Sequence, residues 1–122
     1  MDKDADPGVA SKIQKAREFL EAASLLADSS YNASVSLSAS AAINASDALI
    51  LFNTGSYPTG SEHTRAVTVL RKVVDNNAAI QLSRALLYKT KAQYALGTCS
   101  LAEAESALKS AERLVQKCEN LI

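Results

Sequence analysis

The chain has 122 residues, with 13 basic and 13 acidic side chains, so its formal net charge at neutral pH is zero. This length fits one domain with a single core, and the zero balance argues against a strongly cationic binder of duplex DNA. Hydrophobic residues make up 48% of the chain and aromatic residues only 5%, with no Trp. We therefore expect a folded globular protein whose core is built from Ala, Leu, Ile and Val, as in closely packed helices.

The beginning of the chain, MDKDADPG, is acidic and polar, the opposite of a signal peptide. No stretch approaches the roughly 18–20 uninterrupted apolar residues of a membrane-spanning helix. We expect a cytoplasmic protein with no membrane partner. Residues 1–9 are expected to form a flexible acidic N-terminus and residues 10–122 a single helical domain.

A first helix is predicted after an entry at Asp6 and Pro7, because Pro is tolerated in the first turn of a helix. Its apolar residues recur at steps of three and four, which places them on one helix face. These residues are Ile13, Ala16, Leu20, Ala23 and Ala27. The polar stretch DSSYN, at 28–32, ends this pattern because its side chains favour caps and turns.

A second helix is predicted over about 31–53, although SVSLSAS at 34–40 alternates as a strand would. A lone strand would have no partner to pair with, and helical spacing continues beyond it. The residues with this spacing are Val35, Ala39, Ala42, Ala45 and Leu49. Because its small side chains allow close approach of other backbones, we expect this helix to be the central one.

Three further helices are predicted after a loop at 53–61. Ser61 is expected to cap a short helix with Ala66 and Leu70 on its apolar side. A fourth helix follows DNN at 75–77 and ends at Gly97, a residue able to adopt positive φ; its heptad repeat is Ile80, Leu87 and Tyr94. The last helix opens with a capping box of Ser100 and Glu103. Its expected core residues are Leu101, Ala104, Leu108, Ala111, Val115, Cys118 and Ile122. The predicted fold is an all-α, antiparallel five-helix bundle.

Few residues point to chemistry. The single histidine, His63, has neither cysteine near it in sequence, so we expect a partly exposed histidine at a helix start, no metal site and no cofactor. Cys99 precedes the last helix, whose dipole would lower a thiol pKa, but without a partner histidine we expect an ordinary loop cysteine. Cys118 is expected to be a small core residue, and both cysteines are expected as thiols.

Two polar residues, Asn44 and Asp47, stand one turn apart in the most apolar predicted helix. A buried Asp47 would destabilise the fold by several kcal/mol unless it is paired. The alternative is an exposed Asp47, or one that contacts a helix cap, and the sequence leaves both open.

Charge is unevenly distributed along the chain. Residues 62–91 contain six basic and two acidic side chains, a net charge of +4, and the remaining residues carry −4. A solvated surface accounts for most such runs, but the asymmetry also permits an anionic partner. Arg84 and Lys91 lie seven residues apart, so they are expected to share a helix face and to form, with Lys89 and Tyr94, a weak anion site.

The layout resembles the HEPN domains (higher eukaryotes and prokaryotes nucleotide-binding) from about Lys12 to Leu121. The similarity rests on a small-residue second helix ending in ALILF, on GSEHTRAVTVL after a loop, on a helix ending in LLYKTKAQY, and on an Ala-rich last helix. The resemblance is to a divergent bacterial member. It implies an antiparallel bundle, commonly dimeric, in a family with many metal-independent RNases of toxin–antitoxin, defence and RNA-processing systems.

The RNase motif of that family is an Arg followed after four to six residues by a His, usually near a Tyr. With Tyr94 as the anchor, Ala92 stands at the His position and Ala85, Leu86 or Leu87 at the Arg position. His63 is no substitute, because Ser56, Tyr57 and Pro58 stand where its Arg would be. KTKAQY instead resembles a non-catalytic R-x-x-A-D-Y ending, with Lys89 for the Arg and Gln93 for the acid.

The resemblance therefore implies a non-catalytic, dimeric binding or regulatory module, with a possible partner protein encoded nearby and a weak link to nucleotide or RNA. Residues 91–114 also resemble the turn of a tetratricopeptide repeat, which would make the chain a helical protein-interaction module. Only one copy of that pattern is present, whereas a solenoid needs several. A weakly RNA-binding or RNA-cleaving HEPN protein is the remaining alternative.

Overall fold

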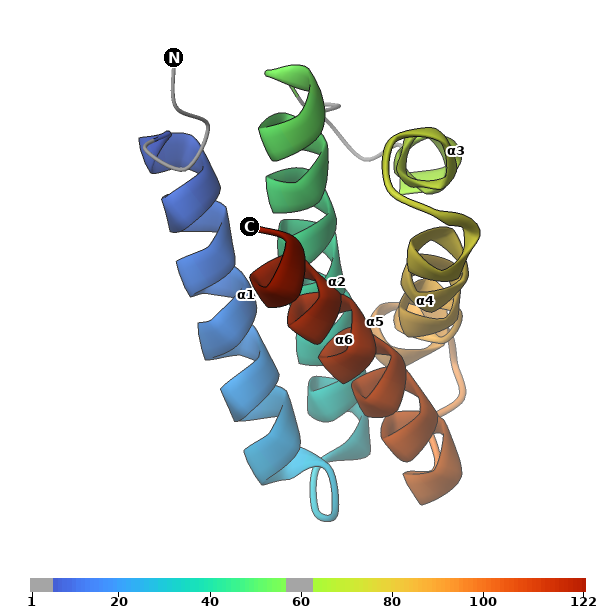
Figure 1. The fold of residues 1–122 in the computed structure, drawn as a ribbon. Helices are drawn as coiled ribbons and strands as arrows, with labels where there is room; N and C mark the ends of the chain where they lie inside the picture. Colours follow the sequence, from blue (N-terminus) through green and yellow to red (C-terminus); the bar gives the residue numbers. More distant parts are fainter. Residues whose placement is uncertain (1–5, 57–62) are drawn as a thin grey trace.

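A computed structural model describes residues 6–56 and 63–122, and no strand occurs in these two ranges. The helices are α1 (Pro7–Leu26), α2 (Tyr31–Thr54), α3 (His63–Val73), α4 (Asn76–Leu86), α5 (Lys89–Gln93) and α6 (Leu101–Leu121). The predicted all-α bundle is confirmed. α1 runs antiparallel to α2, and α6 crosses in front of α2 between α1 and α4 (Figure 1).

The central helix of the bundle is α2, as predicted. It contacts each of the other five helices, and half of its 24 residues are buried. Ala39, Ala42 and Ala45 are fully buried on the predicted face, where their small side chains let neighbouring backbones approach. The core therefore surrounds α2 on several sides, and this explains why its apolar residues are not confined to one narrow stripe.

By length and composition alone, α2 is long and apolar enough to cross a membrane. In the bundle, 61% of its most apolar stretch is buried within the protein. Asn44, Asp47 and several serines also interrupt the apolar sequence. In this structure the apolar side chains of α2 serve to pack the other helices.

The first helix begins at the predicted entry, Asp6 and Pro7. The Asp6 side chain accepts a hydrogen bond of 2.7 Å from the Gly8 N–H, and Pro7 occupies the first turn. Val9 is only 2% exposed and belongs to the core. Because the Asp6 cap starts α1 at Pro7, the predicted N-terminal segment 1–9 overlaps this helix at residues 7–9. Residues 1–5 lie outside the described ranges, as does the predicted cap at Ser61.

The fourth predicted helix is in fact broken after Leu86 into α4 and the short α5. Two members of its expected heptad repeat, Leu87 and Tyr94, are 66% and 77% exposed, so that repeat does not mark the core. The break allows Tyr88 and Ala92 to pack against a small second cluster of buried residues. That cluster contains Val35, Cys99, Ala104 and Ala107.

Glycine does not end this helix as expected. α5 ends at Gln93, and Gly97 does not adopt positive φ. Among the described residues the left-handed conformation occurs at Gly55, with φ of 84°, which caps the end of α2. A side chain at Gly55 would therefore be strained.

The capping box that opens α6 is confirmed: Ser100 accepts from the Glu103 N–H, and the Glu103 side chain accepts from the Ser100 N–H. The predicted apolar stripe of α6 is buried at Ala104, Ala111, Val115 and Cys118. Leu101, however, is 42% exposed, because it lies in the first turn, beyond the edge of the core.

Candidate anion-binding groove

A groove of about 920 Å³ lies between α3 and the end of α4 with α5. Its basic groups are Arg65 and His63 from α3 and Lys89 from α5. Hydroxyl groups and apolar side chains complete it, among them Thr64, Thr68, Ser83, Thr90, Val67 and Leu86. The lining within residues 6–56 and 63–122 contains no carboxylate, so the groove favours a negatively charged ligand.

The groups around His63 shift its pKa in opposite directions. Burial lowers its pKa below the ordinary value, the positive charge of Lys89 lowers it further, and the carboxylate of Asp47 acts in the opposite direction. Its imidazole is therefore neutral at neutral pH and keeps one nitrogen as an acceptor. As expected, the side chain is partly exposed.

Asp47 of α2, the carboxylate that acts on His63, is paired with Lys12 of α1. Lys12 Nζ lies 3.1 Å from Asp47 Oδ2, and Asp47 is 9% exposed. Burial raises the pKa of Asp47, while the hydrogen bond and charge of Lys12 oppose this rise. Of the two alternatives for Asp47, the buried and paired one is observed.

Asn44 is half-buried on the same helix, and its Nδ2 donates to the Ser40 carbonyl oxygen at 2.8 Å. The side chain of Asn44 therefore bonds to the backbone of its own helix, α2.

The predicted anion-site residues are dispersed. Lys89 lines the groove, whereas Arg84 is exposed on α4 outside its lining. Lys91 Nζ bonds both carboxylate oxygens of Glu103, at 2.9 and 3.0 Å, and this raises the pKa of Lys91. The expectation that Arg84 and Lys91 share a helix face is wrong, because α4 ends at Leu86. Tyr94 is largely exposed and does not line the groove.

Neither cysteine is an activated thiol. Burial raises the pKa of Cys99 despite its place before α6, and its N–H donates to Asn32 Oδ1 at 2.8 Å. Burial also raises the pKa of Cys118 to about 12. Both residues are free thiols, and Cys118 is a core residue, as predicted.

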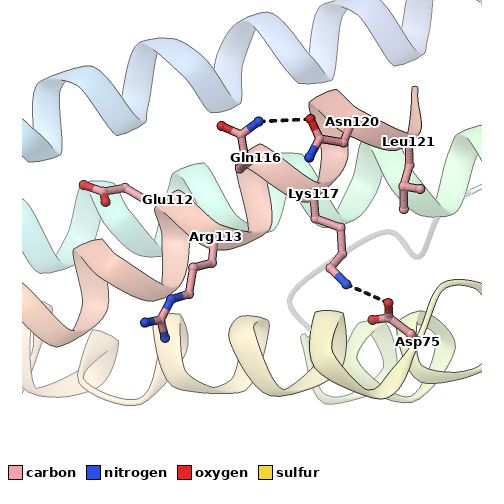
Figure 2. A pocket seen from close by; sticks show the side chains of 7 residues that line it. All are labelled: Asp75, Glu112, Arg113, Gln116, Lys117, Asn120 and Leu121. Carbon is pink, nitrogen blue, oxygen red and sulfur yellow. Dashed lines mark hydrogen bonds and ion pairs between the residues drawn. The ribbon is translucent and has the colours of Figure 1, made fainter.

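A second hollow of about 590 Å³ lies along α6 beside the turn between α3 and α4. Figure 2 shows Lys117 extended toward Asp75, with Lys117 Nζ 2.6 Å from Asp75 Oδ2. Arg113 and Glu112 also line it, so its two cations stand beside two carboxylates. This balance makes the hollow a poorer anion site than the groove.

Sequence reasoning missed Arg65 and Lys12 as site residues. Both belong to helices far from Lys89 in sequence, and no local pattern links them. The excess positive charge of residues 62–91 was the one available signal for Arg65, and it did not indicate which of the six basic residues would converge.

Comparison with known proteins gives one result. A search of curated proteins finds no match to this chain. The model of the HEPN domain matches residues 9–121, nearly the entire chain. This span includes the groove between α3, α4 and α5 and the fully buried core residues of the described ranges, and it agrees with the all-α fold and with the resemblance seen in the sequence. The chain therefore belongs to the HEPN domain family.

Proposed function

We propose that this HEPN chain is a non-catalytic, cytoplasmic binding or regulatory module that acts as a homodimer and takes the phosphate of a nucleotide or RNA in the α3–α5 groove. The observation that carries the proposal is that Arg65, Lys89 and His63 line one groove whose described lining has no carboxylate. Phosphate oxygens accept charge-assisted hydrogen bonds from the Arg65 guanidinium and the Lys89 ammonium group, and these bonds are stronger than neutral ones.

The residues near Tyr94 support the proposed lack of catalysis. Ala92 stands where the family's RNase motif has a His, and it cannot exchange a proton. Lys91, the nearest charged alternative, is held by Glu103, which raises its pKa and keeps it protonated. Acid–base cleavage of RNA lacks a suitable proton acceptor at this end of α5.

Exposed apolar side chains support the homodimer. Leu87, Tyr94, Leu96 and Leu101 are large and exposed within a short part of the chain. Surfaces of this kind commonly serve protein association. By contrast, the packing of five helices around α2 does not extend into the stacked pairs of a tetratricopeptide array. A regulatory partner encoded nearby, as in toxin–antitoxin or defence systems, fits a module without its own catalysis.

The test combines binding, cleavage and mass measurements on the whole chain. Fluorescently labelled short RNA should bind with strong salt dependence, and Lys89→Ala should weaken binding about tenfold. Lys72→Ala removes an exposed charge of α3 outside the groove lining and is the matched control. Light scattering at tens of micromolar should give the mass of a dimer. Cleavage of RNA that is lost in the Lys89→Ala variant, or equal effects of the two Lys substitutions, would contradict the proposal.

A further inference from the structure

The groove offers more positive charge than an internal phosphate of RNA can neutralise. Arg65 and Lys89 reach it from different helices, and the described lining supplies no carboxylate to offset them. A phosphodiester carries one negative charge, whereas a phosphate monoester carries about −1.5 to −2 at pH 7. A monoester therefore matches the two cations, and a diester leaves one of them unneutralised.

His63 adds a third positive charge to the groove when its imidazole is protonated. In the protein without ligand, His63 is coupled to two charged groups. Lys89 of α5 disfavours a positively charged imidazole, and Asp47 of α2 favours one. Lys12 of α1 is bonded to Asp47 and offsets that carboxylate, and Arg65 is the other cation of α3 in the groove. The described lining from α4 is uncharged. A dianion in the groove would neutralise the cations and so favour the charged imidazole.

We infer that the groove selects a terminal phosphate monoester over an internal phosphodiester, and that binding of the dianion draws a proton from solvent onto His63. This inference rests on the proposed phosphate-binding function of the same groove. The protonated imidazole has donors on both nitrogens, so it can donate to a phosphate oxygen. Apolar side chains such as Val67 and Leu86 remain for the rest of the ligand, and the volume suits a nucleotide-sized group.

The expected pH dependence has a definite sign. The pKa of His63 is lowered in the free protein and rises when the dianion binds, so a proton is taken up at pH values between the two. Affinity should therefore increase as the pH falls from 8 toward about 6.5. Below about pH 6 the monoester itself takes up a proton, and its affinity should decrease again.

The experiment is isothermal titration of the whole protein with three probes: 5′-AMP, a 5′-phosphorylated pentaribonucleotide, and the same pentaribonucleotide with a 5′-hydroxyl. Each titration is run at pH 7 in two buffers with different ionisation enthalpies, because the difference in heat gives the number of protons taken up. The phosphorylated oligonucleotide should bind at least about tenfold more tightly than the hydroxyl form and take up a fraction of one proton. If 5′-AMP binds and the phosphorylated oligonucleotide does not, the source of the monoester is a free nucleotide. If both 5′-AMP and the phosphorylated oligonucleotide bind, the source is an RNA end.

His63→Gln keeps a polar side chain and should abolish proton uptake while reducing the preference for the phosphorylated end. Lys72→Ala should change neither quantity, and circular dichroism verifies the fold of each variant. Measurable and equal affinity for the phosphorylated and hydroxyl oligonucleotides, or the same proton uptake in His63→Gln, overturns this inference but leaves the groove as a phosphate site. Absence of binding by all three probes overturns the proposed function itself.

Discussion

Asp47 brings a carboxyl group into the buried side of α2, where its pairing with Lys12 connects the first two helices. Burial acts against the ionised carboxylate and Lys12 offsets part of this effect, so removal of Lys12 alone leaves a buried carboxylate without this cation. The same carboxylate is coupled to His63, which relates the core of the bundle to the groove.

Lys12→Met should lower the free energy of unfolding by about 2 kcal/mol at pH 7, because it leaves Asp47 buried and ionised without this cation. The folded pKa of Asp47 is already raised, so its ionisation lowers stability as the pH rises through that pKa. The loss caused by Lys12→Met should therefore be largest near neutral pH and shrink toward pH 4.

Urea unfolding at several pH values provides the measurement. Lys15→Met removes an exposed lysine of the same helix and should change stability by less than about 0.5 kcal/mol. Adding Asp47→Asn to Lys12→Met should recover part of the loss, because no buried charge then remains at this position. A loss of equal size at pH 4 and pH 7 would show that the charge of Asp47 is not its cause.

At the scale of elements, Asp75 makes two bonds at the turn between α3 and α4. Asp75 Oδ1 accepts from the Ala78 N–H at 2.7 Å and thereby caps α4, while Asp75 Oδ2 lies 2.6 Å from Lys117 Nζ of α6. The hydrogen bond from Lys117 and then the bond from Ala78 lower the pKa of Asp75. One carboxylate thus caps α4 and attaches it to the last helix, and Figure 2 shows the second of these two interactions, with Lys117.

Asp75→Ala should destabilise the protein by about 1 kcal/mol through loss of the cap, whereas Asp75→Asn should lose only a few tenths because an amide oxygen still caps the helix. Since the folded pKa of Asp75 is depressed, its contribution is complete above the ordinary Asp pKa and is lost as the pH falls through the lower folded value. Thermal unfolding compared with the exposed Asp28→Ala control checks this. Equal losses for the Ala and Asn variants would rule out the cap as the source.

At the scale of the whole molecule, the small side chains of α2 determine how closely the bundle can pack. Ala45 is fully buried on a helix that contacts all five others. Enlarging a side chain there would push neighbouring helices apart, since protein cores have little free space.

Ala45→Leu should therefore lower the free energy of unfolding by about 1–3 kcal/mol despite its greater hydrophobicity. Ala102→Leu, in the exposed first turn of α6, is the control and should change stability by less than about 0.5 kcal/mol. Denaturant unfolding followed by circular dichroism measures both. A stabilised Ala45→Leu variant would mean that the core around α2 contains unfilled space.

The sequence alone determined the features that depend on neighbours within a few residues. Apolar spacing of three and four residues predicted α1, α2, α3 and α6. The capping box at Ser100 and Glu103 could also be predicted from the sequence, because both residues lie within one helical turn. The HEPN resemblance, confirmed by the family match, likewise rested on the order and character of these helices.

Tertiary structure alone decided the features that join distant parts of the chain. The break at Leu87 and Tyr88 depends on packing against residues of α2 and α6, so a locally continuous helical pattern could not reveal it. Lys12 and Asp47 form a pair only because α1 lies against α2. In the same way, Arg65 and Lys89 line one groove because α3 packs beside α4. Local spacing in the sequence does not determine which distant charges share a surface.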